Sequence, residues 1–151
     1  MKRFIFPMII LCAALFVVIG CSNEKAIENT IGDWTDAINN GDVAALTDVV
    51  SSDSDWYDPL LIENVITINF NGLTPISYHI IEIDVDNPYA DVPSTADYLG
   101  YPNINAKFVM KKESGFLSFL SPKWKVFQCW SDLDGGGFQL GVDEDWRRFK
   151  K

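Results

Sequence analysis

Hydrophobic residues recur with a helical period between residues 27 and 38. Four apolar positions follow the spacing i, i+4, i+7 and i+11, which places them on one face of a helix. These four residues are Ile27, Ile31, Trp34 and Ile38. The sequence Asn39-Asn40-Gly41 is typical of a helix end. Asp42 is a suitable N-cap for a second, shorter helix over Val43–Val50.

Alternating apolar and polar residues predict strands in the second half of the chain. In Ser77–Val85, one face is predicted to carry His79, Ile81, Ile83 and Val85. In Ile104–Lys111, one face is predicted to carry Ile104, Ala106, Phe108 and Met110. Trp124–Trp130 is apolar on both faces, as expected of a strand that is covered on both sides. Phe138–Val142 is predicted to form a last short strand.

Three segments give weaker or conflicting patterns. Leu60–Phe70 follows an Asp-Pro helix start, so we favour a helix at its beginning, but its second half is rich in β-branched residues, and helix and strand both remain open for its end. Asp86–Asn103 contains three prolines and three tyrosines and is predicted to be a long, ordered loop. Gly115–Leu120 is an apolar connection that either contacts a partner or folds back beneath a helix, and we favour the second.

The first twenty residues have the layout of a secretory signal. Lys2 and Arg3 precede an uncharged apolar stretch from Phe4 to Ile19, and Gly20 supplies a small residue before a cleavage point. We therefore predict that Met1–Gly20 is a signal peptide. The alternative is an uncleaved N-terminal anchor.

The residues at this cleavage point carry a more specific signal. Val18-Ile19-Gly20-Cys21 resembles the bacterial lipobox. The resemblance implies lipid attachment to Cys21 and cleavage before it, which would give the two or more acyl chains that stable anchoring needs. We expect residues 21–25 to form the lipidated cysteine and its tether, and 26–151 a single domain. The expected location is the cell membrane or outer membrane, on its extracytoplasmic side.

Charge and cysteine usage limit the classes of function. The signal segment contains two of the twelve basic residues and none of the 21 acidic ones, which leaves the mature chain with a net charge of −11. Such a charge argues against binding nucleic acid, and membrane contact is expected through the lipid alone. With Cys12 in the signal and Cys21 lipidated, only Cys129 remains, so an intramolecular disulfide is excluded.

The order of elements, helices first and antiparallel strands afterwards, predicts an α+β fold. Residues 31–46, which read Ile-Gly-Asp-Trp-Thr-Asp-Ala-Ile-Asn-Asn-Gly-Asp-Val-Ala-Ala-Leu, resemble the NTF2-like (cone-shaped, ketosteroid-isomerase-like) superfamily. Trp124-Lys125-Val126-Phe127 is similar to its closing core strands. The resemblance implies N-terminal helices packed on a curved antiparallel sheet with a pocket between them. It does not imply catalysis, because members include enzymes and nonenzymatic binding domains.

Face and element assign five side chains to such a pocket. They are Trp34, Tyr78, His79, Phe108 and Trp124. His79, the only histidine, is a candidate general base, with Asp33 or Asp36 as a carboxylate partner, although no spacing favours either. The competing and preferred interpretation is a hydrogen-bonded histidine at a strand end.

Metal and cofactor motifs are weak. Asp132-Leu133-Asp134-Gly135-Gly136-Gly137 resembles the start of a calcium loop, but its fifth position is Gly136 and its twelfth is Asp143 rather than Glu. We therefore predict a flexible turn there. The acidic cluster Asp84, Asp86, Asn87 and Asp91 is predicted to be a solvated loop. One histidine and one unmodified cysteine cannot form a normal zinc site, so we expect no metal and no cofactor.

Three functions remain for this chain on sequence grounds. We favour a nonenzymatic, lipid-anchored extracytoplasmic domain that binds a small apolar ligand or a protein partner. The first alternative is an enzyme of the isomerase or dehydratase type with His79 as general base. The second is a homodimeric structural module of the cell envelope that uses its sheet face.

Overall fold

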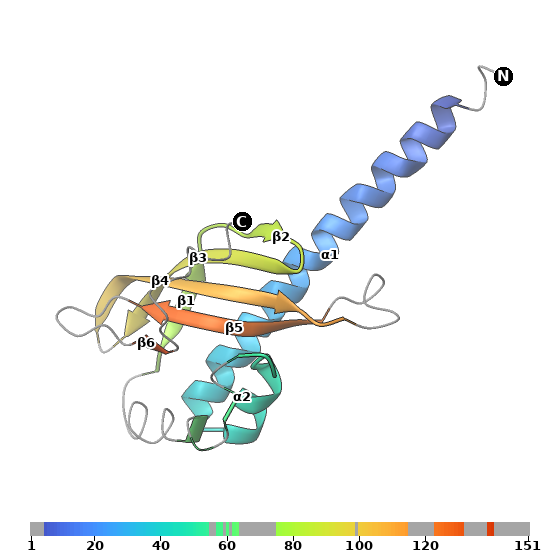
Figure 1. Cartoon of the computed structure of the whole chain (residues 1–151). Coiled ribbons are helices and arrows are strands. Elements are labelled where there is room, and N and C mark those ends of the chain that lie inside the picture. Colours follow the sequence, from blue (N-terminus) through green and yellow to red (C-terminus); the bar gives the residue numbers. More distant parts are fainter. Residues whose placement is uncertain are drawn as a thin grey trace.

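A computed structural model of the 151-residue chain describes residues 5–54, 57–58, 60, 62–63, 75–98, 100–114, 123–131 and 139–140. Within these residues the helices α1 and α2 precede the strands β1 to β6, and Figure 1 shows their arrangement. The helices are α1 (Ile5–Asn40) and α2 (Val43–Val49). The strands are β1 (Ser77–Ile80), β2 (Asp84–Asp86), β3 (Tyr89–Tyr98), β4 (Tyr101–Lys112), β5 (Trp124–Ser131) and β6 (Gln139–Leu140).

The helical predictions for residues 27–50 are confirmed. Ile27, Ile31, Trp34 and Ile38 are all buried along one face of α1, together with Ala37. Asp42 caps α2, because its side-chain Oδ1 accepts a hydrogen bond from the backbone N–H of Ala45 at 2.9 Å. Leu60, Ile62 and Glu63 are helical, in agreement with a helical start to that segment. The rest of Leu60–Phe70 lies outside the described residues.

All strands pair antiparallel in one sheet, in the order β1-β3-β4-β5-β6, with β2 also paired to β3. The apolar face predicted for β4 is confirmed, since Ala106, Phe108 and Met110 are buried. β5 has nearly the predicted bounds. The predicted last strand is present as β6, of which two residues are described.

The prediction of a long loop over Asp86–Asn103 is wrong. Most of it forms β3, which pairs with β4 along one side and with β1 and β2 along the other. Its buried face consists of small residues, and prolines and polar residues lie between them. The alternation of apolar and polar residues is therefore too weak to predict a strand. That face carries Ala90, Val92, Ser94 and Ala96. The acidic cluster predicted for a loop therefore lies on β2, β3 and the turn between them.

Pro93 fits inside β3 because of a gap in the neighbouring strand. The N and C=O of one residue point to the same neighbour in an antiparallel ladder. The Pro93 carbonyl accepts from the N–H of Ile81 at 3.0 Å, so its nitrogen faces the break between β1 and β2. No ladder hydrogen bond is lost there, which is the situation in which a strand tolerates proline.

The same break corrects the prediction for Ser77–Val85. This segment forms two strands, β1 and β2, and residues 81–83 between them are not in the ladder. Tyr78 and Ile80 pack against the core, whereas His79 is exposed and Ile81 is 67% exposed. The inward face of β1 is therefore opposite to the predicted one.

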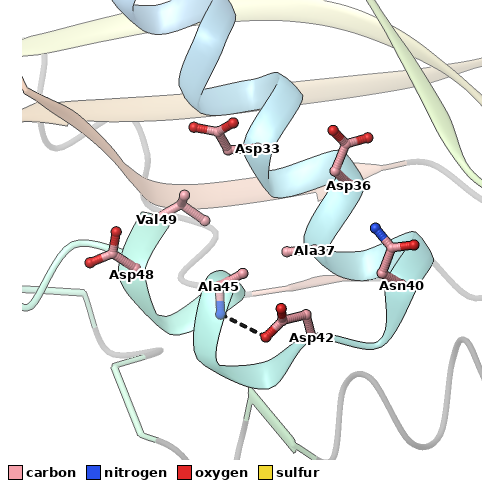
Figure 2. A pocket seen from close by; sticks show the side chains of 8 residues that line it. All are labelled: Asp33, Asp36, Ala37, Asn40, Asp42, Ala45, Asp48 and Val49. Carbon is pink, nitrogen blue, oxygen red and sulfur yellow. Dashed lines mark hydrogen bonds between the residues drawn. The ribbon is translucent and has the colours of Figure 1, made fainter.

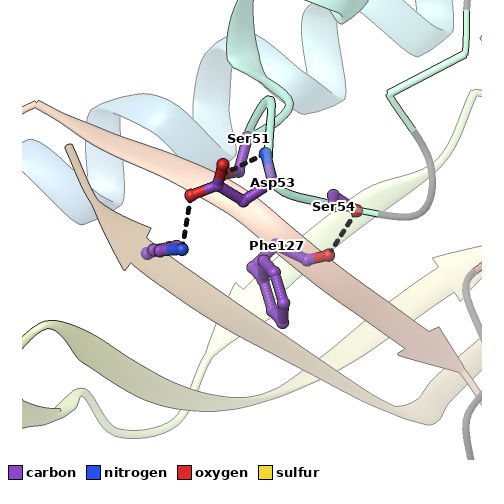
Figure 3. Close-up of polar contacts among 5 residues, drawn as sticks. Ser51, Asp53, Ser54 and Phe127 are labelled. Atoms are coloured by element: carbon purple, nitrogen blue, oxygen red, sulfur yellow. Dashed lines mark hydrogen bonds and ion pairs between the residues drawn. The ribbon is translucent and has the colours of Figure 1, made fainter.

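Polar side chains fasten the helical layer to the sheet. Thr30 of α1 donates from its hydroxyl to the Trp124 carbonyl of β5 at 3.0 Å. After α2, Val50 forms a parallel bridge with Val126, and Ser54 donates to the Phe127 carbonyl at 2.7 Å. Figure 3 shows this contact beside Asp53, whose carboxylate pairs with the Lys111 ammonium at 2.5 Å. The turn after α2 is thus bound to β4 and β5.

The N-terminal half of α1 extends away from the sheet, as Figure 1 shows. Within the part of the chain that the structure describes, no helix is long and apolar enough to cross a membrane. The segment predicted as a tether, residues 22–25, is helical, and Asn23 is only 6% exposed. The domain is therefore in contact with α1 from Asn23 onward rather than from residue 26.

Replacement of Asn39 by alanine is expected to destabilise the fold. Asn39 Nδ2 donates to the Ile76 carbonyl and Asn39 Oδ1 accepts from the Ile76 N–H, each at 2.9 Å. Ile76 is 7% exposed, so Asn39→Ala leaves two backbone groups buried without these partners. We expect a loss of about 2–4 kcal/mol in the free energy of unfolding, measured by urea denaturation.

The neighbouring Asn40 provides the control for this substitution. Asn40 is exposed on the same helix turn, so Asn40→Ala is expected to change stability by less than about 0.5 kcal/mol. Equal effects of the two substitutions would show that the Asn39–Ile76 pairing does not contribute.

Candidate functional site

Three aromatic side chains from three elements meet in the core between α1 and the sheet. Trp34 comes from α1, Tyr78 from β1 and Phe108 from β4. The Phe108 ring centroid lies 4.8 Å from that of Tyr78 and 6.1 Å from that of Trp34, both in edge-to-face geometry. Phe108 is completely buried. We refer to Trp34, Tyr78 and Phe108 as the aromatic cluster.

Two ionisable groups of the interior are held in their neutral forms. Burial, reinforced by the nearby Cys129, raises the pKa of Tyr78 well above its ordinary value. Burial also raises the pKa of the Cys129 thiol to about 12. At neutral pH the Tyr78 hydroxyl and the Cys129 thiol are therefore uncharged and can serve as hydrogen-bonding groups but not as bases.

The indole N–H of Trp34 is the one buried side-chain donor in the described part of the chain that has no hydrogen-bond partner. Trp34 is 4% exposed. The indole is near enough to lower the pKa of the Tyr78 hydroxyl, against the larger effect of burial, but the pair does not reach hydrogen-bond geometry. This N–H is thus left without a well-formed hydrogen bond, which is unusual, because buried donors normally have acceptors.

His79 does not join the aromatic cluster. It lies on the outer face of β1, and its Nε2 is 3.2 Å from Oδ2 of Asp97 on β3. Both side chains are largely exposed, 60% for His79 and 45% for Asp97. The hydrogen bond from the Asn103 N–H lowers the pKa of Asp97, and the contact with His79 lowers it further by a smaller amount. The carboxylate beside His79 is thus Asp97, which the sequence did not indicate, rather than Asp33 or Asp36.

Trp124 also lies apart from the cluster, at the start of β5. Its indole N–H donates to Asn23 Oδ1 at 3.4 Å, and the Lys112 ammonium lies 5.8 Å from its ring centroid. Of the five predicted pocket residues, the structure therefore brings three together and separates His79 and Trp124. Beside Tyr78 it adds Cys129, which the sequence indicated only as the one unmodified cysteine.

A second feature is an open groove of about 260 Å³ between α1 and α2, shown in Figure 2. Its floor is apolar and includes Ala37, Ala45 and Val49. Four carboxylates surround it, those of Asp33, Asp36, Asp42 and Asp48. Within the described ranges no group of three or more acidic, histidine or cysteine side chains has the geometry to hold a metal ion. The predicted calcium loop after Asp132 lies outside those ranges.

This architecture, two N-terminal helices packed on an antiparallel sheet, is an NTF2-like α+β fold. A solved structure with the same fold is that of an NTF2-like protein of unknown function from Shewanella baltica OS155. The two chains are 16% identical with a TM-score of 0.52, and the match covers 71% of this chain and 90% of the other. No family model and no curated protein matches the sequence. At this identity the likeness establishes the fold alone.

The Cys129 thiol is expected to be unreactive in the folded protein. A pKa of about 12 leaves roughly a thousandfold less thiolate at pH 8 than an ordinary thiol has. A chromogenic disulfide reagent should therefore modify the native chain far more slowly than the chain in denaturing urea. A Cys129→Ala variant reports the background, and comparable native and denatured rates would contradict burial of the thiol.

Proposed function

We propose that this chain is a lipid-anchored extracytoplasmic domain that binds a small, neutral and largely apolar molecule at the aromatic cluster. The anchor is inferred from the lipobox-like Val18–Cys21 and the signal layout before it. The binding role rests on the chemistry of the groups around Trp34.

The interior favours binding over acid–base catalysis. The titratable side chains at the cluster, Tyr78 and Cys129, stay protonated at neutral pH because burial raises both pKa values. The buried polar side chains in the described residues are one asparagine and four serines, so no buried carboxylate is on hand as a base. A general base needs a pKa near the working pH. The exposed His79 lies on the other face of β1, away from these buried groups.

The observation that carries the proposal is the unsatisfied N–H of Trp34. A buried donor without an acceptor costs about 1–3 kcal/mol. A ligand oxygen that accepts from Trp34 Nε1 would recover this free energy, while its apolar part would pack against the rings of Tyr78 and Phe108. The chemical class is therefore a neutral apolar molecule with an acceptor such as a carbonyl or ether oxygen.

Native mass spectrometry of the purified full chain tests this proposal. We expect a co-purifying neutral organic mass, and we expect Trp34→Phe to lower its occupancy about tenfold because one buried hydrogen bond is lost. Trp124→Phe is the matched control, since Trp124 is equally buried but lies outside the cluster. Loss of ligand in both variants would point to general destabilisation. A bare, dimeric protein would overturn the proposal and favour the structural module.

The His79–Asp97 pair is the specific observation that favours the enzymatic alternative. Under the proposed binding role, His79→Ala leaves both the fold and ligand occupancy unchanged, because the side chain is exposed and lies on the face of β1 opposite to Tyr78. Isomerase or dehydratase turnover that is measurable in the wild type and abolished by His79→Ala would contradict the binding role. Asp33→Asn, at the carboxylate that His79 does not meet, is the control for an effect of charge.

A further inference from the structure

The folded domain begins immediately after the predicted lipid-bearing residue. Asn23 is 6% exposed, and its Oδ1 accepts from Trp124 Nε1 and from Lys112 Nζ, each at 3.4 Å. Four residues later Ile27 is completely buried. Cys21 is two residues before Asn23, so the sheet holds the chain almost at the point of lipid attachment.

This short link limits how far the domain can stand from a bilayer. Two residues span at most about 7 Å even when fully extended. Each headgroup layer of a bilayer is about 5–8 Å thick. If the acyl chains of Cys21 lie in the hydrocarbon, Asn23 is therefore at the level of the headgroups, and the end of the sheet that binds Asn23 is held there with it.

The end of the sheet near Asn23 is formed by β4 and β5. Lys112 pairs with Trp124 at the end of their ladder, and the N–H of Glu113 donates to the Lys123 carbonyl at 2.9 Å. The chain that joins Ser114 to Lys123 thus leaves and returns at this end. Its sequence, Gly-Phe-Leu-Ser-Phe-Leu-Ser-Pro, contains four large apolar residues. Their placement lies outside the described residues, but both points of attachment are fixed.

We propose that this end of the sheet, defined by Asn23, Lys112, Glu113, Lys123 and Trp124, rests on the lipid bilayer that anchors Cys21. The inference depends on the proposed lipidation and adds an orientation to it. With a net charge of −11 on the mature chain, attraction to anionic lipid does not drive the contact. The short link between Cys21 and the sheet holds this end at the lipid surface.

The opposite end of α1 is then well separated from the anchored end. Asn40 follows Asn23 by 17 residues, which is about 25 Å along a helix. Figure 1 shows α2 at this far end, with the sheet crossing α1 between the two ends. The acidic groove between α1 and α2 accordingly lies toward this end of α1, away from Asn23.

Depth-dependent quenching on the full-length protein tests this orientation. The chain is produced in a bacterial host, and intact mass together with incorporation of a labelled fatty acid reports whether Cys21 is acylated. The protein is then reconstituted into phosphatidylethanolamine–phosphatidylglycerol vesicles that contain a lipid with a nitroxide on its headgroup. A fluorophore is attached through Ser114→Cys or, as the matched control, Asn40→Cys, since both positions are exposed.

We expect several-fold stronger quenching at position 114 than at position 40. Equal quenching at the two positions in an acylated protein would overturn the orientation and leave the lipid anchor in place. An unacylated Cys21 would instead overturn the anchor itself, and with it the basis of this inference. The buried thiol of Cys129 does not compete for the label while the domain is folded.

Discussion

The packing of one apolar face of α1 against one face of the sheet is the constraint on which this fold depends. Among the described residues Cys129 is a free, buried cysteine, so burial of apolar side chains is the main source of stability there. Phe108 is central to that packing, because it is completely buried and contacts rings from α1 and β1. Full burial of a side chain of this size is worth about 1.5–3 kcal/mol. The site proposed for ligand binding is therefore built from the same residues that hold the two layers together.

Apolar packing is not directional, and polar contacts fix the position of the helices on the sheet. Asn39 holds the end of α1 to the backbone of Ile76, and Thr30 holds its middle to β5. Ser54 does the same for the turn after α2. Each of these side chains forms a hydrogen bond with the backbone rather than with another side chain. The contact therefore depends on where the backbone lies and not on the type of the partner residue. This is why sequence patterns do not reveal them.

The parts of the fold that sequence predicts are those governed by local periodicity. The face of α1 and the buried face of β4 follow from spacing alone. The strand β3 cannot be predicted in this way, because Pro93 is tolerated only opposite the break between β1 and β2. That break is a property of the neighbouring strands and not of β3 itself. The prediction of the strand face that carries His79 is wrong for a related reason. The alternation from His79 to Val85 is real, but the strand ends at Ile80, and a shift of one residue exchanges the faces.

Burial, which assembles the candidate site, also restricts its chemistry. A tyrosine and a thiol that are taken out of water lose their ability to ionise near neutral pH, whereas an indole N–H loses only its acceptor. The interior thus keeps donors and apolar surface, the groups that recognise a neutral ligand. Trp34 lies eleven residues from Asn23, about 16 Å along α1. In the proposed orientation, the distance between the bilayer and the aromatic cluster is therefore no more than the length of this small domain. The anchor would thus place the binding site close to the lipid phase, in which an apolar ligand is concentrated.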